Sequence, residues 1–395
     1  MKLAFVTPWY GPNIPGGAES EARRTAQRLH QAGYEVEILT TCIRDFFADW
    51  GKNYHKPGID FVNGLLVRRF RVEKRDKAQF NAINRDLIQR RSVSAEAERL
   101  FINEMFRAPD LYRFIEEQSN QYIFFFIPYM FASSYFGAQI CPERSVIIPC
   151  LHDEGYAYMD IFREMLPAVR ALAFNTQSEM ALAANLYGPT TEQIRSVVGI
   201  GVETDFEYDA ARFREKYDVA YPFILYVGRK AAEKNTPLLV DYWLRYVQEN
   251  ETDAKLIFIG PGEMPIPAEA AAQVLDLGFV SLQDKYDAYA AATALCQPSR
   301  NESFSLVMME SWLTKTPVLV HAGCNVTRDH CRQSNGGLYF ANYDEFAATI
   351  DYLLGNVTAA QQMGRQGYEY VMANFQWPMV LAKYDAIISA VNTGL

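Results

Sequence analysis

The chain carries one pattern twice: a short apolar run, a glycine-rich loop, and a longer segment with helical periodicity. The pattern first covers 2–7, 11–17 and 18–32, and it restarts with the apolar run 223–227 and the loop 228–234. A strand–loop–helix–strand order gives parallel strands joined by right-handed crossovers. Since 395 residues are too many for one ordinary core, the sequence predicts two α/β domains, each with a Rossmann-like parallel sheet.

Further apolar runs extend both series and set the boundaries. The predicted strands are 35–41, 65–72, 122–127, 145–151 and 171–175 in the first series, and 255–259, 293–297 and 317–320 in the second. The join falls within 202–222. We therefore expect an N-terminal domain at 1–205, a second domain at 206–375, and a C-terminal helix at 376–395 with Pro378 in its first turn.

Composition excludes several classes of protein. A net charge of -9 argues against a nucleic-acid partner. Six cysteines without a C-x-x-C pair indicate reduced core thiols rather than a zinc site or disulfides. The uncharged stretch 122–140 is interrupted by Pro128 and polar residues, so we expect a strand, a turn and a helix there, and no membrane span. These features are typical of a cytoplasmic protein.

One segment reverses the overall charge. Arg68–Arg91, which overlaps a polar helical stretch at 76–115, holds nine basic residues against three acidic ones. Two interpretations stay open. The segment is either a solvated helical face or a surface that meets anionic lipid headgroups or an acceptor's pyrophosphate.

Two glutamates eight residues apart give the strongest chemical signal. Glu302 lies in a loop after a predicted strand, and Glu310 lies more than a turn into the helix that follows. A carboxylate accepts two hydroxyl hydrogens, which suits a sugar diol. The free amides near Ser305 and Leu306, where the helix begins, attract phosphate.

This segment resembles the E-x7-E signature of glycosyltransferase family 4, and the resemblance covers nearly the whole chain at separate points. It implies the GT-B fold: two Rossmann-like domains facing each other across a cleft, with the C-terminal helix crossing back to the N-terminal one. It also implies that Glu310 holds the donor ribose and Glu302 the donor-sugar hydroxyls. The amides of Ser305 and Leu306 would meet the diphosphate.

Four other places match the same family. Arg229 and Lys234 resemble its G-R-x4-K-G stretch and could neutralise a leaving pyrophosphate, although Asn235 replaces the final glycine. His152 follows an apolar run at the place where the family's histidine contacts the donor sugar. The last two sites are the glycine loop that ends in Gly17, facing phosphates or acceptor, and the loop with Phe279 and Val280, beside the donor base.

The predicted chemistry is retaining transfer without a metal or cofactor. No Asp-x-Asp occurs in the sequence, so charge neutralisation falls to Arg229, Lys234 and helix dipoles. His152 and Glu302 would hold the sugar in place while the acceptor attacks.

Substrates are the most open part of the prediction. GDP-mannose is the favoured donor, with UDP-glucose or UDP-N-acetylglucosamine as alternatives, and the acceptor is a glycan or lipid-linked sugar of a surface polysaccharide pathway. The enzyme would associate with the inner membrane face if the basic segment meets a lipid-linked acceptor. A nucleotide-sugar epimerase, a phosphorylase or a non-catalytic sugar-binding protein are rival readings. A Rossmann-type oxidoreductase is disfavoured because no G-x-G-x-x-G follows the first strand.

Overall fold

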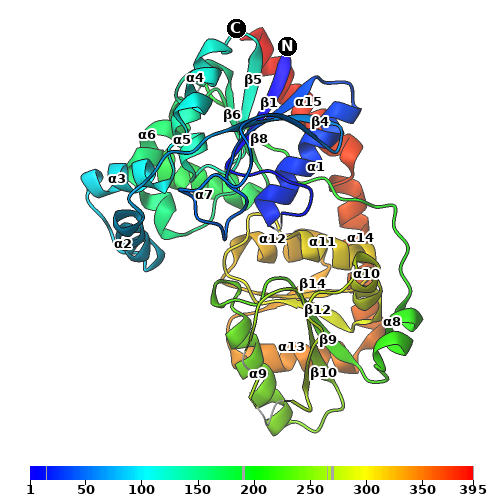
Figure 1. The fold of residues 1–395 in the computed structure, drawn as a ribbon. Helices are drawn as coiled ribbons and strands as arrows, with labels where there is room; N and C mark the ends of the chain where they lie inside the picture. The colour runs from blue at the N-terminus through cyan, green and yellow to red at the C-terminus, as the bar shows by residue number, and fades with distance from the viewer. Residues whose placement is uncertain (15, 189–191, 265, 268–270, 395) are drawn as a thin grey trace. The chain divides into compact units, whose positions relative to one another are not determined.

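A computed structural model describes residues 1–14, 16–188, 192–264, 266–267 and 271–394 (Figure 1). The chain forms two compact units. Unit 1 comprises Met1–Gly201 together with Trp377–Leu395, and unit 2 comprises Val202–Gln376. These divisions lie close to the predicted boundaries at 205/206 and 375/376. The acceptor and donor roles assigned to the two domains stay predictions.

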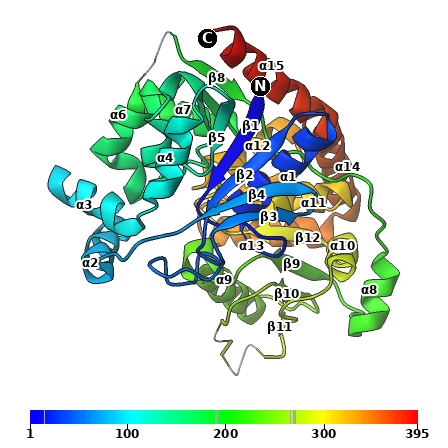
Figure 2. The same ribbon diagram turned by 45° about the horizontal axis from the view of Figure 1, so that its top comes forward.

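Unit 1 is built on an eight-stranded sheet in the order β3-β4-β2-β1-β5-β6-β7-β8. All neighbours pair in parallel except β3 and β4. Figure 2 shows β4, β2 and β1 running side by side. The strands are β1 (Lys2–Thr7), β2 (Val36–Thr41), β3 (Gly58–Val62), β4 (Leu65–Phe70), β5 (Tyr122–Phe126), β6 (Ser145–Ile147), β7 (Ala171–Phe174) and β8 (Ile194–Val197).

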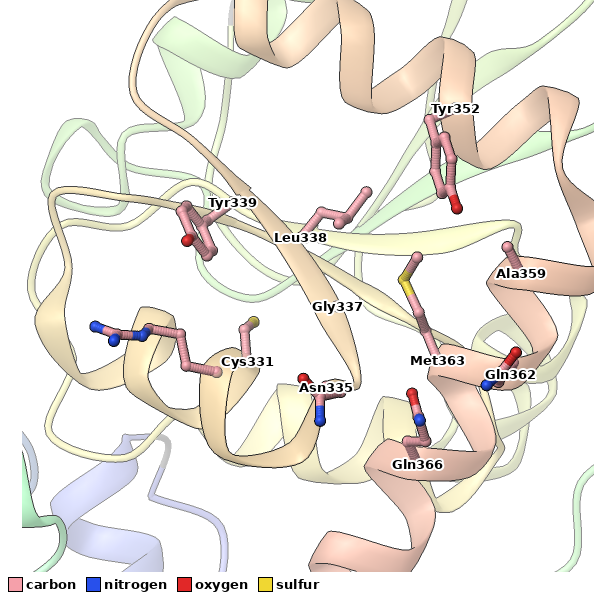
Figure 3. Close-up of a pocket in the computed structure, with 11 residues that line it drawn as sticks. Cys331, Asn335, Gly337, Leu338, Tyr339, Tyr352, Ala359, Gln362, Met363 and Gln366 are labelled. Atoms are coloured by element: carbon pink, nitrogen blue, oxygen red, sulfur yellow. The ribbon is translucent and has the colours of Figure 1, made fainter.

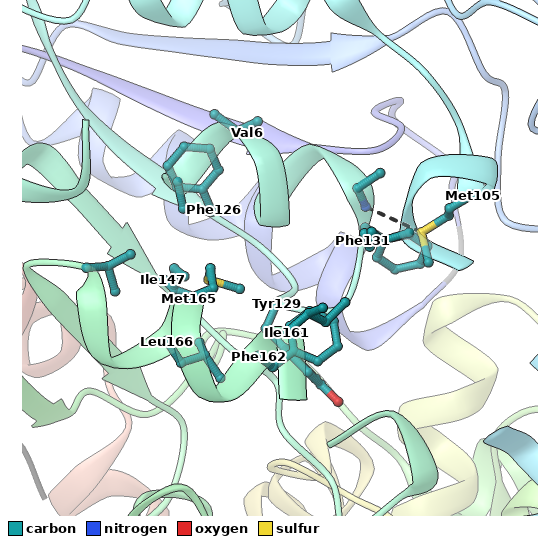
Figure 4. Close-up of a cluster of buried hydrophobic side chains, with 14 of the residues drawn as sticks. Val6, Met105, Phe126, Tyr129, Phe131, Ile147, Ile161, Phe162, Met165 and Leu166 are labelled. Atoms are coloured by element: carbon teal, nitrogen blue, oxygen red, sulfur yellow. Dashed lines mark hydrogen bonds between the residues drawn. The ribbon is translucent and has the colours of Figure 1, made fainter. Parts of the chain in front are cut away.

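Helices cover both faces of that sheet, because β1, β2 and β5 bury side chains alternately on each side. One cluster joins the sheet to α1 (Gly17–Gln31) and α15 (Trp377–Thr393), so the C-terminal helix is part of the core of unit 1. The other cluster, shown in Figure 4, includes Phe126 and Phe162. The helices on that side are α2 (Lys77–Ile88), α3 (Ala95–Met105), α4 (Pro109–Glu117), α5 (Ala132–Ala138), α6 (Asp160–Ala168) and α7 (Gln177–Tyr187).

Unit 2 holds a six-stranded sheet in the order β11-β10-β9-β12-β13-β14, with every pair parallel. Its strands are β9 (Phe223–Val227), β10 (Lys255–Ile259), β11 (Val274–Asp276), β12 (Ala294–Gln297), β13 (Val318–His321) and β14 (Gly337–Phe340). Its helices are α8 (Ala210–Tyr217), α9 (Thr236–Glu249), α10 (Leu282–Ala291), α11 (Leu306–Leu313), α12 (Asn325–Ser334), α13 (Tyr343–Gly355) and α14 (Val357–Asn374).

The structure corrects the sequence reading at several strands. β3, β8, β11 and β14 were not predicted. The β3–β4 hairpin turns at Asn63 and Gly64, which both have positive φ, a turn signal present in the sequence. The predicted strand 145–151 ends at Ile147, because Pro149 has no amide hydrogen to donate and Cys150 turns the backbone at φ 53°.

The uncharged stretch 122–140 folds as β5 followed by α5. Within the described ranges, no helix is both long enough and apolar enough to cross a membrane.

Candidate functional site

The predicted site residues of unit 2 follow its strands at one edge of the sheet. Strands β9 and β12 are neighbours, although β10 and β11 separate them in sequence. The order of strands therefore reverses between them, and in such sheets ligands bind outside the carboxyl ends of the strands at this reversal. Arg229 and Lys234 come from the loop after β9, and Glu302 comes from the loop after β12.

An ion pair joins these two loops. The Lys234 ammonium donates to Oε1 of Glu302 at 2.7 Å, and both side chains are partly or largely buried. Asn235 follows in the left-handed conformation at φ 59°, and its side-chain amide donates to the Pro298 carbonyl at 3.0 Å. Asparagine tolerates this conformation better than most residues, so it can replace the family's glycine while tying the two loops together.

The turn before α11 is strained. Ser305 precedes the helix with φ 74°, and its hydroxyl oxygen is buried without a hydrogen-bond partner in the part of the chain that the structure describes. Its side chain does not cap the helix, so the first amides of α11, beginning at Leu306, stay open. Phe304 packs edge-on against Phe375, with ring centroids 4.9 Å apart, and anchors the turn. Strain of this kind persists where the surroundings determine the conformation, commonly at ligand sites.

Glu310 does not stand alone, which the sequence did not reveal. Lys285 donates to both of its carboxylate oxygens at 2.9 Å, and the Tyr289 hydroxyl donates to Oε2 at 2.9 Å. Lys285 and Tyr289 lie four residues apart on α10 and therefore on one helix face. This spacing is the only sequence signal that could have found them.

Close backbone contacts shape the edge around Arg229. Gly228 has φ 147°, and a Cβ built on Gly260 would lie 2.1 Å from the Gly228 carbonyl, so only glycine fits there. The next residue, Lys230, is buried and pairs with Asp276 at 2.6 Å. Arg229 is exposed, so it is the cation of this pair that a ligand can reach.

An unpacked aromatic side chain follows β11. Phe279 is 86% exposed, the most exposed large hydrophobic residue described. It follows Gly278, which has φ 64° and whose carbonyl accepts from the Gly260 amide at 2.7 Å. Val280 is half-buried beside it. The position fits the predicted stacking on a donor base, because nothing in the fold requires an apolar side chain there.

In unit 1, His152 follows a tight turn after β6. Its Nδ1 lies 3.7 Å from Oε1 of Glu154, and its side chain is 29% exposed. Glu179 fixes the backbone before His152 by two hydrogen bonds. Its Oε1 accepts from the Leu151 amide at 2.6 Å, and its Oε2 accepts from the Asn175 amide at 2.5 Å. The imidazole of His152 is therefore accessible to a ligand, while the backbone before it is fixed.

Gly17 begins α1, directly after the carboxyl end of β1 and its loop. A Cβ at Gly17 would meet no atom within 4 Å, so the fold does not require glycine there. Gly16 before it has φ 138° and does require it. Gly17 is exposed, so the space beside it is open to solvent.

Two cavities in the described part of unit 2 lie away from these residues. One of about 550 Å³ lies along β14, between α12 and the helices α13 and α14, and Figure 3 shows Tyr339, Tyr352 and Gln366 around it. None of the predicted site residues lines it. Among the described residues, no group of three or more His, Cys, Asp or Glu side chains is placed to hold a metal ion.

Comparison with known sequences finds similarity to glycosyltransferases. The profile of the family described as "Glycosyl transferases group 1" matches residues 221–356. A D-inositol 3-phosphate glycosyltransferase of Corynebacterium efficiens is 25% identical over 252 residues, which span 58% of this chain but only 59% of that protein. An uncharacterized glycosyltransferase of Methanocaldococcus jannaschii is 22% identical, with 95% of each chain covered.

Comparison with solved structures identifies the fold. The structure of Anabaena HepE in complex with UDP is similar with a TM-score of 0.70 at 13% identity, covering 99% of this chain and 100% of that one. The architecture is the GT-B fold, and residues 221–356 match a glycosyltransferase family profile. Membership of family 4 stays a prediction.

Proposed function

We propose that this protein is a glycosyltransferase that moves a hexosyl group from a nucleotide-sugar to a glycan or lipid-linked acceptor, with retention and without a metal ion. The observation that carries the proposal is the Lys234–Glu302 pair beside the strained Ser305 turn, at the strand-order reversal of unit 2. This arrangement sets a cation, a carboxylate and open amides at one sheet edge. A diphosphate and a sugar diol need these three groups.

In this mechanism the bond between the anomeric carbon and the diphosphate oxygen breaks, and the electron pair leaves with the nucleotide. Arg229, Lys234 and the amides of Ser305 and Leu306 stabilise that charge. The acceptor hydroxyl then attacks from the same face, and its proton passes to a phosphate oxygen. Glu302 holds the sugar, and the resemblance to the family implies that His152 also contacts it.

Glu310 would bind the donor ribose with Lys285 still in place. Each carboxylate oxygen has more than one lone pair, so an oxygen that accepts from Lys285 can also accept from a ribose hydroxyl. Lys285 and Tyr289 then fix the carboxylate before the donor arrives, which reduces the ordering needed on binding.

For the donor we place UDP first, because the similar HepE structure holds UDP. The sequence-based preference for GDP-mannose is the alternative that the same experiment tests. A thermal-shift panel with UDP, GDP, ADP and their hexose conjugates, each with and without EDTA, separates them. A shift for one nucleotide that survives EDTA supports metal-free donor binding, and no shift with any of them would reject the donor site.

Product analysis then identifies the reaction. Release of nucleoside diphosphate with a new glycoside on an added sugar acceptor supports transfer, and a changed hexose still attached to the nucleotide would indicate an epimerase instead. Binding without any turnover would favour the sugar-binding reading.

A membrane role for Arg68–Arg91 is the least supported part of the proposal. Six of its nine cations are already engaged: Arg68 with Glu37, Arg69 with the Tyr10 carbonyl, Arg75 with the Glu104 carbonyl, Lys77 with Asp49, Arg90 with Asp153 and Arg91 with Asp86. Co-sedimentation with vesicles of anionic and of neutral lipid tests the role. Equal recovery with both would remove it.

A further inference from the structure

A buried polar cluster lies behind His152 in unit 1. It consists of Glu21 from α1, Cys150 from the turn after β6, Asn175 from the end of β7, and Glu179 from α7. Glu21, Asn175 and Glu179 are each about 1% exposed, and Cys150 is also buried. Burying polar groups this deep is costly where they are unpaired, and Oε1 of Glu21 and Oδ1 of Asn175 have no hydrogen-bond partner among the described residues.

Glu179 controls the backbone on both sides of the cluster. One of its oxygens receives the Leu151 amide and the other receives the Asn175 amide. Its own amide donates to the Thr176 hydroxyl that caps α7. Leu151 directly precedes His152 in the chain. The carboxylate of Glu179 therefore fixes the backbone position from which the His152 imidazole extends.

Glu21 holds the same turn from the other side. Its Oε2 accepts from the Asn175 side-chain amide at 2.9 Å and from the Cys150 thiol at 3.5 Å. Cys150 has φ 53°, an unfavourable backbone conformation for cysteine. The turn therefore keeps a strained shape because two buried carboxyl groups fix the residues around it.

We propose that Glu179 and Glu21 are positioning residues for His152, holding the Cys150–Leu151 turn so that the imidazole meets the donor sugar. This inference rests on the proposed role of His152. It assigns a task to two acids that do not touch the substrate in the proposed mechanism.

The charge state of the cluster makes the inference testable. The groups facing Glu21 are Glu179 from α7, the Cys150 thiol, and Tyr384 from α15, none of them cationic. Burial, with a smaller contribution from Glu179, raises the pKa of Glu21 to about 8, and burial raises the pKa of Glu179 to about 7. Glu21 is thus a neutral acid near pH 7, and its ionisation places a new charge against the turn.

The experiment compares Glu21→Gln, Glu179→Gln and His152→Ala with Glu164→Gln, the same change at an exposed glutamate of α6. Nucleoside diphosphate release from UDP-glucose and from GDP-mannose is followed between about pH 6 and about pH 10. For the parent protein, kcat should fall as pH rises through about 8. Glu21→Gln mimics the neutral acid, so it should keep the neutral-pH rate within about twofold and lose the alkaline fall.

Glu179→Gln cannot accept both backbone amides, so its kcat should fall by about 10- to 100-fold with the donor KM unchanged. A merely structural defect would instead lower the melting temperature and the active fraction without changing the pH profile. If Glu179→Gln does not fold, the profile of Glu21→Gln decides.

The possible failures are distinct. Full activity in His152→Ala would reject the role of His152 in the proposed function. Loss of activity in His152→Ala, together with a Glu21→Gln profile that keeps the alkaline fall or a Glu179→Gln rate equal to that of Glu164→Gln, would overturn the positioning role alone.

Discussion

The Ser305 turn and the Cys150 turn are both strained, but they use opposite electrostatics. In unit 2, the Ser305 turn lies among ion pairs, with Lys234 on Glu302 and Lys285 on Glu310. In unit 1, the Cys150 turn is held by buried carboxyl groups whose hydrogen-bond partners are amides and a thiol. The first suits a charged ligand, whereas the second holds Glu21 against the turn as a neutral acid near pH 7.

The largest effect should come from removing the Lys234–Glu302 ion pair beside the Ser305 turn. Glu302→Ala and Lys234→Ala should each lower kcat by about 100-fold or more, because each removes an interaction aimed at the reacting group. Glu215→Ala, an exposed change on α8, is the matched control. Steady-state kinetics with the donor found by thermal shift measures this, and normal turnover in both variants would refute the assignment.

Glu21, beside the Cys150 turn, should make the stability of the protein depend on pH. Folded Glu21 keeps its proton up to about pH 8, whereas the unfolded chain releases it near its ordinary pKa of 4.5. The contribution of Glu21 to the free energy of unfolding should therefore be complete below pH 4.5 and should be lost as pH rises from there to about 8. Urea unfolding at pH values across that window should show a clear decline for the parent and a smaller one for Glu21→Gln, in which the raised pKa of Glu179 still contributes. Equal declines would show that Glu21 is ionised in the fold.

A smaller effect is expected at the donor base. Phe279→Ala should weaken nucleotide binding by about 1–2 kcal/mol, since stacking on a base contributes that much. Stability should not change, because the side chain is 86% exposed. Tyr339→Ala, at another exposed aromatic of unit 2, is the control in calorimetric titration. Equal affinities for the two variants would exclude stacking by Phe279.

The smallest effect concerns backbone strain. Ser305→Gly should raise the free energy of unfolding by about 1 kcal/mol, because glycine accepts a positive φ. Lys315→Gly, at another left-handed residue with φ 61°, should gain similarly and leave donor binding unchanged. Weaker donor binding in Ser305→Gly alone would show that the strain serves the site. If neither variant gains stability, the strain argument fails for both.

Much of the fold could be predicted because parallel strands buried on both faces read as continuous apolar runs. β9 and β10 were predicted to the residue. β14 was missed because it is a short strand whose residues are only partly buried, and β11 because just three residues form it. Short strands of this kind depend on their neighbours more than on their own sequence.

The site was predictable only where charge, glycine and spacing act locally. Glu302, Lys234 and Glu310 stand in such patterns, but their partners do not. Lys285 reaches Glu310 across 25 positions, and Glu21 reaches Asn175 across 154. Those contacts depend on how strands are ordered in each sheet, which no local pattern carries.

The placement of α15 affects how the protein is made. This helix follows unit 2 in the sequence, yet its Trp377, Tyr384 and Ile387 complete a core that contains β1. During synthesis, unit 2 is fully available before unit 1 can close. The apolar surface that α15 covers stays uncovered until Trp377–Thr393 has been made, so synthesis of α15, rather than synthesis of the first 201 residues, sets when unit 1 can become native.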